Sequence, residues 1–312
     1  MQALLVVFVA SSIAFWLMKS ARGGPFGSSI DSASYSAEVH EYRRQQMGLN
    51  DPLLVQYSRW TFSILRGDLG ISIQPGNPKV SAIIADAVPL TMQLMVLALL
   101  SSILGGIALG AWQGAHVESR IQRASSAVAV VLYAMPEFWL ATVLIFVFSI
   151  QFRMFPSAGV SEPGTSYSTI RAVLDRLWHL VLPWLSLTLV GVAIFARYQR
   201  AAMRDALNQL FVRTARAKGV SEYSVLRQHA LRVAVLPVIT VGGLFFPALL
   251  TGAVLVEKIF SWPGLGRVLT TAVESRDYYV VTGVVIVGSA MTAFGSFAAD
   301  ILREVCDPRL RT

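Results

Sequence analysis

Six apolar stretches, each near the length of about 20 residues that crosses a bilayer as a helix, alternate with polar segments along the chain. The pattern predicts an all-α integral membrane protein with six transmembrane helices. The first stretch could instead be a signal peptide, but its apolar run is too long and no basic residues precede it. The predicted spans are residues 1–18, 89–112, 124–150, 177–197, 233–256 and 280–302.

The density of Lys and Arg in the polar segments predicts the orientation. An even number of spans places both termini on one side of the membrane. The segments 113–123, 198–232 and 303–312 are roughly twice as dense in Lys and Arg as 19–88, 151–176 and 257–279. Because basic loops stay in the cytoplasm, we expect both termini there. Residues 19–88 then form an extracytoplasmic insertion after the first helix, and 303–312 form a cytoplasmic tail.

The loop 198–232, between the fourth and fifth spans, is basic yet has helical periodicity. A first amphipathic helix is expected to end at Gly219, which tolerates a left-handed conformation, and a second to begin after Ser221. Two such helices would suit docking on another protein. The alternative is an ordinary loop whose arginines only fix topology. The predicted apolar faces comprise Met203, Leu207, Leu210, Phe211 and Thr214, and then Tyr223, Leu226, Ala230 and Val233.

Residues within three spans affect helix geometry. In the second span, Gly105, Gly106 and Gly110 allow another helix to approach closely. In the third, Pro136 is expected to kink the helix. Glu137 is an acid deep in the membrane, which makes it a candidate for function. Alternatively, Glu137 caps the kink, meets a structural partner or is protonated.

The fifth span is predicted to be a broken helix because it is rich in Gly and Pro. Irregular backbone survives in a membrane only against protein or a water-filled cavity. We therefore interpret the third and fifth spans as parts of a translocation pathway that rearranges. The candidate pathway residues are Pro136, Glu137, Gly242, Gly243, Pro247 and Gly252.

Composition excludes several classes of protein. Of the 312 residues 54% are hydrophobic and only 14% charged, too few charges for a soluble protein. The net charge of +8 comes from residues that flank spans, so no nucleic acid is expected. The single cysteine, Cys306, excludes an intrachain disulfide, and the four histidines lack metal-ligand spacing. The sequence contains no G-x-x-x-x-G-K-[ST] string for binding a nucleotide and no nucleophile accompanied by a base. We therefore expect the chain neither to catalyse a reaction nor to bind a cofactor or metal.

Short motifs in these segments resemble a known family. The cytoplasmic loop of ABC importer permeases follows E-A-A-x-x-x-G, then nine residues, then I-x-L-P. Ala215, Gly219 and Leu231 match it, whereas Arg232 stands in place of the proline. The departures are those typical of the dipeptide/oligopeptide permeases among the binding-protein-dependent importers. The residues that carry this resemblance are Arg213, Thr214, Ala215, Arg216, Ala217, Lys218, Gly219, His229 and Leu231.

A second motif follows the fifth span and is similar to the string F-S-W-P-G-L-G-R, then R-D-Y, of the same permeases. Read structurally, its Trp-Pro-Gly turn predicts an outer re-entrant hairpin. At Glu137 the chain departs from the family, where a small or polar residue is more usual. The residues of this outer motif are Phe260, Trp262, Pro263, Gly264, Gly266, Arg267, Arg276 and Asp277.

The resemblance implies the type I ABC importer permease fold, in which the loop 198–232 forms cytoplasmic coupling helices. The implied partners are a second homologous permease, two cytoplasmic ATPase subunits or domains that use ATP and Mg, and an extracytoplasmic solute-binding protein. The implied location is the bacterial cytoplasmic (inner) membrane, among its lipids. Relatives usually have a short basic stretch before the first helix, so the N-terminus is expected to be slightly clipped.

The substrate and two other function classes stay open. Relatives divide among short peptides, nickel complexes and glutathione, and the absence of a midplane histidine favours peptides, which need a wide and sparsely charged path. A self-sufficient secondary transporter would be expected to show an internal repeat, and no clear one is visible. A membrane-anchored assembly or receptor protein would need no broken fifth helix.

Overall fold

The computed structural model describes residues 2–20, 50–117, 119–162, 164 and 169–306, and apart from one bridge between Ile71 and Lys79 their regular elements are helices. This confirms the predicted all-helical class. The chain divides into two compact units. The first comprises Met1–Thr91 and Pro263–Ala293, and the second comprises Met92–Trp262 and Phe294–Thr312.

The first unit has a core of small and branched aliphatic residues. It contains α1 (Gln2–Ser20), α3 (Leu53–Leu65), α12 (Leu265–Glu274) and the first parts of α4 (Val80–Ala115) and α13 (Tyr278–Cys306). Their side chains exclude water along three helices, which stabilises the unit through burial. The core residues are Val80, Ile84 and Ala87 of α4, Leu265 and Ala272 of α12, and Val280, Val281 and Val284 of α13.

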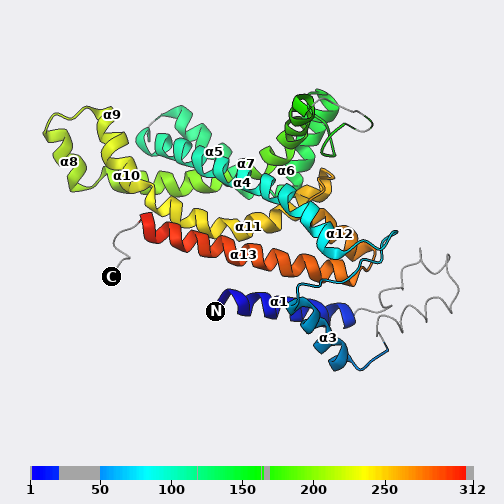
Figure 1. The fold of residues 1–312 in the computed structure, drawn as a ribbon. Coiled ribbons are helices and arrows are strands. Elements are labelled where there is room, and N and C mark those ends of the chain that lie inside the picture. Colours follow the sequence, from blue (N-terminus) through cyan, green and yellow to red (C-terminus); the bar gives the residue numbers. More distant parts are fainter. Residues whose placement is uncertain (1, 21–49, 118, 163, 165–168, 307–312) are drawn as a thin grey trace. The chain divides into compact units, whose positions relative to one another are not determined.

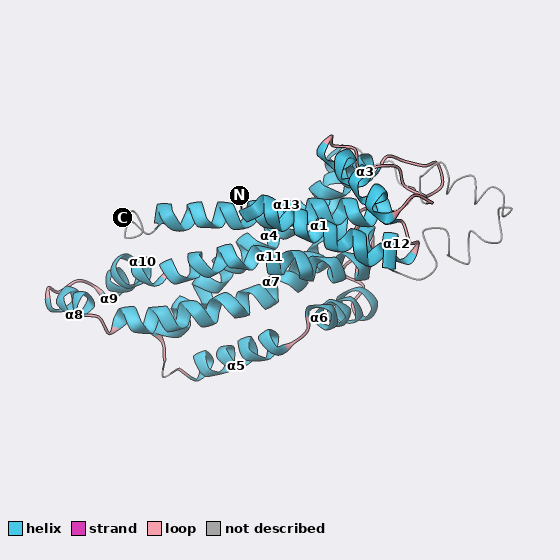
Figure 2. Cartoon of the chain, turned by 90° about the horizontal axis from the view of Figure 1, so that it is seen from below, coloured by secondary structure: helices cyan, strands magenta, loops and turns pink. Residues whose placement is uncertain are grey.

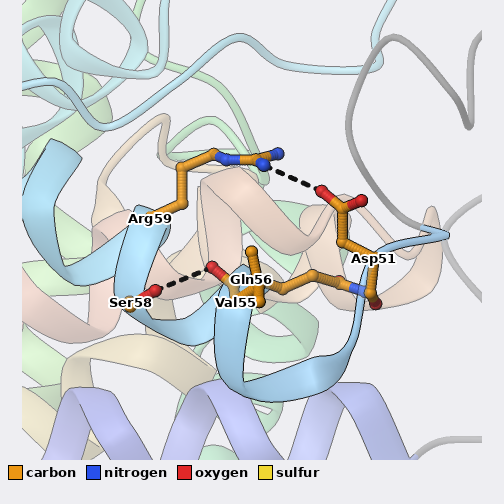
Figure 3. A network of polar contacts seen from close by, with 5 residues as sticks. All are labelled: Asp51, Val55, Gln56, Ser58 and Arg59. Atoms are coloured by element: carbon orange, nitrogen blue, oxygen red, sulfur yellow. Dashed lines mark hydrogen bonds and ion pairs between the residues drawn. The ribbon is translucent and has the colours of Figure 1, made fainter.

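Helices α1 and α3 of this unit contact each other through aromatic side chains. Phe15 lies 5.0 Å from Trp60 between ring centroids, and the hydroxyls of Ser12 and Tyr57 lie 2.8 Å apart. Two side chains of α3 form hydrogen bonds with Asp51, just before the helix starts (Figure 3). Arg59 donates to the Asp51 carboxylate at 2.8 Å, and the side chain of Gln56 donates to the Asp51 carbonyl. α3 thus begins where Asn50-Asp51-Pro52 predicts a helix start.

The second unit is built around one long helix. α7 (Thr169–Leu207) contacts both α5 (Arg120–Ala134) and α11 (Leu236–Ile259), and Figure 2 shows it between them. The unit also contains the rest of α4 and α13, α6 (Glu137–Leu144), η1 (Ile145–Gln151), α8 (Leu210–Ala217), α9 (Glu222–Ser224), η2 (Val225–Ala230) and α10 (Leu231–Ala234).

Glycines let α4 and α7 approach closely, as the sequence predicts for the second span. A Cβ added at Gly106 would overlap the side chain of Phe195, and one at Gly110 would lie 2.5 Å from the carbonyl oxygen of Ala196. Because no side chain fits there, these positions set the distance between the two helices. The close approach predicted from the small residues is confirmed.

The helices fit the predicted spans in part. By length and apolar composition, four helical segments could cross a membrane: Val80–Ala115, Thr169–Leu207, Glu222–Gly243 and Tyr278–Ile301. A bent pair, Arg120–Ala134 with Glu137–Gln151, would make a fifth. Within α1, the apolar segment counted among the residues with described side chains is the shorter stretch Leu5–Leu17. The count of six, and the sidedness of residues 19–88, therefore stay predictions.

One boundary and one break differ from the predictions, and the kink predicted at Pro136 is confirmed. α4 begins at Val80 rather than at Pro89, because residues 80–87 bury side chains in the core of the first unit and one missing N–H does not end the helix. α11 continues through Pro247, so the fifth helix is not broken. The break falls in the third predicted span, where the axes on either side of Pro136 differ by 109°. Figure 1 shows α5 and α6 pointing in different directions.

Candidate functional site

The loop after α7 turns a sharp corner at Gly219 (Figure 1, between α8 and α9). Gly219 has φ +78°, its N–H donates to the carbonyl of Arg216, and the N–H of Val220 donates to that of Ala215. These are the two hydrogen bonds of a Schellman motif, in which a left-handed residue ends a helix. The predicted helix stop at Gly219 is confirmed.

The second half of the loop is helical but not a regular α-helix. α9, η2 and α10 form one continuous run from Glu222 to Ala234, and η2 has π-helical hydrogen bonding. Ser221 occupies the N-cap position without a side-chain capping bond. In a π-helix, residues five apart face the same way, which places Val225 and Ala230 on one buried side.

The two halves of the loop share a small core of their own, which we call the loop core. This core brings together residues on both sides of the Gly219 corner, so the loop is a compact unit rather than an extended connection. The buried residues of the loop core are Met203, Ala206, Val212, Ala215, Val225, Ala230 and Ala234.

Several residues of the predicted apolar faces lie outside the loop core. Leu210, Phe211 and Thr214 are exposed, because α7 ends at Leu207 and α8 starts in a new direction, burying Val212 and Ala215 instead. Tyr223 and Val233 are also exposed, and for Val233 the reason is that the preceding π-helical segment shifts the register of the second face. A regular 3.6-residue period could not predict either change.

The outer surface of the corner is polar and carries the motif residues. Arg216 forms a two-fold hydrogen bond with Glu222 across Gly219, at 2.6 and 3.0 Å. His229 and Leu231 are half-buried. Ala215 belongs to the loop core, so it supports the surface from inside and is not part of it. The exposed motif residues are Arg213, Thr214, Arg216, Ala217, Lys218 and Gly219.

The break between α5 and α6 places Glu137 at the start of a helix. Pro136 precedes α6 with extended backbone, φ −62° and ψ 136°, and Glu137 is its first residue. A carboxylate in the first turn of a helix interacts favourably with the helix dipole, but α6 has no side-chain capping hydrogen bond, so both the structural and the functional explanation of Glu137 stay open. Because of the 109° bend, its depth in the membrane does not follow from counting residues along a straight helix.

The candidate pathway residues of α11 pack against other helices. A Cβ at Gly242 would lie 2.9 Å from Ile103 of α4, and one at Gly243 would overlap the side chain of Ala299 of α13. Pro247 and Gly252 lie inside the continuous helix. α6 contacts α11, so the two elements singled out as pathway candidates are neighbours. Gly242 and Gly243 therefore lie where α11 contacts neighbouring helices.

The outer motif starts in the second unit. α11 ends in a second Schellman motif, where Ser261 has φ +52° and the N–H of Trp262 donates to the carbonyl of Glu257 at 2.8 Å. Phe260 and Trp262 are buried, and the N–H of Gly159 donates to the Phe260 carbonyl. These aromatic side chains are therefore buried instead of facing outward.

The rest of the outer motif lies in the first unit, as a corner between α12 and α13. Pro263 is half-buried, Gly264 and Gly266 are buried at the start of α12, and Arg267 is exposed. The N–H of Leu265 donates to the hydroxyl of Thr91 at 2.8 Å, which ties α12 to α4. The structure thus has a helical hairpin at the predicted place.

Asp277 is the buried anchor of that corner. Arg276 has φ +57°, and the N–H of Asp277 donates to the Ala272 carbonyl, closing α12. The fully buried carboxylate accepts hydrogen bonds from the Ser72 hydroxyl at 2.5 Å and from the N–H groups of Ile73 and Val280. Ser72 escaped the sequence analysis because it lies 205 residues from Asp277 and carries no local signal.

Comparison with known proteins gives a consistent result. Residues 106–312 match the sequence profile of the family described as binding-protein-dependent transport system inner membrane component. An oligopeptide transport system permease protein, AppB, of Bacillus subtilis is 36% identical over 298 residues, covering 96% of this chain and 93% of the relative. A putative peptide permease protein of Brucella suis is 37% identical, covering 95% of this chain and 92% of the relative.

Two further similarities widen the comparison. A glutathione transport system permease protein, GsiC, of Escherichia coli is 34% identical over 98% of this chain and 94% of its own length. A crystal structure of an amino acid ABC transporter matches with a TM-score of 0.52 and 17% identity, covering 73% of this chain and 94% of the other. At this identity the structural match bears on the fold alone.

Proposed function

The chain belongs to the family of binding-protein-dependent transport system inner membrane components, and we propose that it is a permease subunit of an ATP-driven ABC importer for short peptides. The observation that carries the peptide assignment is sequence identity of 36–37% over nearly the whole length to relatives named as peptide permeases. The chain spans more than nine-tenths of those relatives, so the likeness is not limited to one motif.

Coupling to ATP hydrolysis is assigned to the corner at Gly219. The loop core makes this corner a compact element that can transmit a displacement as a unit, while its exposed polar surface offers a docking face. We assign ATP and Mg binding to two cytoplasmic ATPase subunits or domains, since this chain has no phosphate-binding loop sequence. Closure of the ATPases around ATP would then move α7 and α11 through the loop between them.

The translocation path is assigned to the interface with a second, homologous permease. The break at Pro136 beside α11 is the element best suited to rearrange, because a broken helix can change its angle without losing internal hydrogen bonds. Six spans with both termini in the cytoplasm would place the Gly219 corner inside the cell. The protein would lie in the inner membrane of a bacterium, in contact with its lipids.

A solute-binding protein is assigned to the opposite side of the membrane. The extracytoplasmic insertion, residues 19–88, and the corner at Asp277 would form the face beneath it. Asp277 holds residues Ser72 and Ile73 against the start of α13, so this part of the insertion and the corner between α12 and α13 form one structure. A binding protein pressing on this face would act on α13 directly.

Glutathione import is the second candidate, because the glutathione permease is 34% identical over 98% of this chain. Glutathione is itself a modified tripeptide, so the two assignments share their substrate chemistry. Nickel import and a self-sufficient secondary transporter are weaker alternatives.

Substrate uptake by cells that lack this chain tests the assignment. Deletion should lower the uptake of labelled di- to pentapeptides, restored by a plasmid copy, while cellular nickel stays unchanged. If labelled glutathione uptake falls and peptide uptake does not, the second candidate is correct. A fall in nickel with normal peptide uptake would contradict the proposal.

A further inference from the structure

Five arginines lie along the pair formed by α5 and α7, four of them toward the start of α5, and the proposed function does not use them. α5 carries two of them in its first turn, and α7 carries three at spacings of three and four, which places these on one face of the helix. We call this group the basic cluster. It comprises Arg120, Arg123, Arg197, Arg200 and Arg204.

Two contacts across the helix pair place Arg197 near the end of α5 and Arg200 nearer its start. Arg200 donates to the hydroxyl of Ser126 at 2.9 Å, and the guanidinium carbon of Arg197 lies 4.7 Å from the ring centroid of Tyr133. A later residue of α7 thus meets an earlier residue of α5, so the helices run antiparallel. Arg204 and Arg123 each lie about one turn beyond the Arg200–Ser126 contact, in the same direction.

The basic cluster has no neutralising partner in the described part of the chain. The contacts made by Arg197 and Arg200 are to a neutral ring and a neutral hydroxyl, and the Nε of Arg200 is buried without a hydrogen-bond acceptor. No ion pair among the described residues involves any of the five arginines, or the neighbouring Asp205. A bound anion would reduce the mutual repulsion of these charges.

The surface beside the basic cluster is apolar and indicates what kind of anion fits. α5 exposes Ile121, Val128 and Val131, with exposed fractions of 71%, 59% and 52%. A free inorganic anion would leave this surface in contact with water. An amphiphile with a negative head and hydrocarbon chains would cover both the arginines and the apolar side chains.

We propose that the basic cluster binds the phosphate headgroup of an anionic phospholipid, whose acyl chains lie along the exposed apolar face of α5. Basic pockets between membrane helices bind such headgroups, with each arginine near the surface contributing roughly a five-fold gain in affinity. The bound lipid would brace α5 against α7 on the near side of the break at Pro136. This site does not depend on which substrate the permease carries.

The test is lipid binding to the purified full chain in a neutral detergent, measured by native mass spectrometry. Wild-type protein should bind dioleoylphosphatidylglycerol more tightly than dioleoylphosphatidylcholine. R200Q/R204Q should weaken phosphatidylglycerol binding roughly thirty-fold, since two charges are lost. The matched control is R171Q/R176Q, which removes two exposed arginines from the other end of α7 and should leave binding unchanged.

Two further measurements distinguish a lipid site from a general anion site and from misfolding of the variant. R200K/R204K keeps the charge and should retain most of the binding, because Lys and Arg near an anionic headgroup contribute similarly, and this variant guards against one that merely misfolds. Salt should weaken phosphatidylglycerol binding to the wild-type protein. Equal binding of both lipids to wild type, or unchanged binding to R200Q/R204Q, would overturn the proposal. Displacement of the lipid by an equal concentration of inorganic phosphate would show an anion site without lipid preference and would also overturn it.

Discussion

At the scale of single residues, backbone conformation and burial decide what each motif position does. Gly219 is left-handed and nothing lies within 4 Å of the place where a Cβ would be, so its role is conformational and not steric. Ala215, four residues earlier, is small because it is buried in the loop core. The sequence predicts the first of these roles from glycine itself. It could not predict the second, since an alanine within a basic segment gives no sign of which way it faces.

The left-handed conformation at Gly219 leads to a prediction about coupling. G219V should lower stimulated ATPase activity and uptake about ten-fold or more, because a left-handed conformation costs an ordinary residue about 1–2 kcal/mol and a β-branched one more. G219N is the matched control, since asparagine tolerates this conformation, and it should retain most of the activity. Both variants should reach the membrane in normal amount, measured by immunoblot. Equal activity of G219V and wild type would show that the corner is not required.

At the scale of elements, packing against neighbours overrides local helix signals. Pro89 lies inside a helix because residues on its N-terminal side are buried, and Pro247 lies inside another. Pro136 does end a helix. Of the three prolines expected to mark a helix start or a break, only Pro136 does so. The π-helical segment in the loop changes which side chains are buried, and no 3.6-residue pattern contains that information. Glycine spacing, in contrast, correctly predicts the close contact made by α4.

The contact between α4 and α7 leads to a prediction about stability. G110L should lower the thermal unfolding temperature of the purified protein, because its Cβ would meet the Ala196 carbonyl oxygen at 2.5 Å and the helices would have to separate. Overpacking of this kind typically costs about 1–3 kcal/mol. A108L, on an exposed position of the same helix, is the control and should change the unfolding temperature little. The same shift in both variants would mean that the glycine does not set the helix distance.

At the scale of the whole molecule, composition and motifs predict the class well and the arrangement poorly. Apolar stretches predict a helical membrane protein, and the motifs near Gly219 and Asp277 predict the family, as the comparisons confirm. The contact of Ser72 with Asp277 and that of Ser126 with Arg200 join residues far apart in sequence, so no local pattern contains them. The span count, the orientation and the partner subunits stay predictions, because they depend on a membrane and on chains outside this one.

The most direct test of the central claim is tripeptide uptake into proteoliposomes. They would contain this chain, the second permease and the ATPases, with ATP enclosed and the binding protein outside. The account predicts accumulation that requires ATP hydrolysis and is lost when a non-hydrolysable ATP analogue replaces ATP. Accumulation driven by a proton or sodium gradient without ATP would contradict it and would instead identify a secondary transporter.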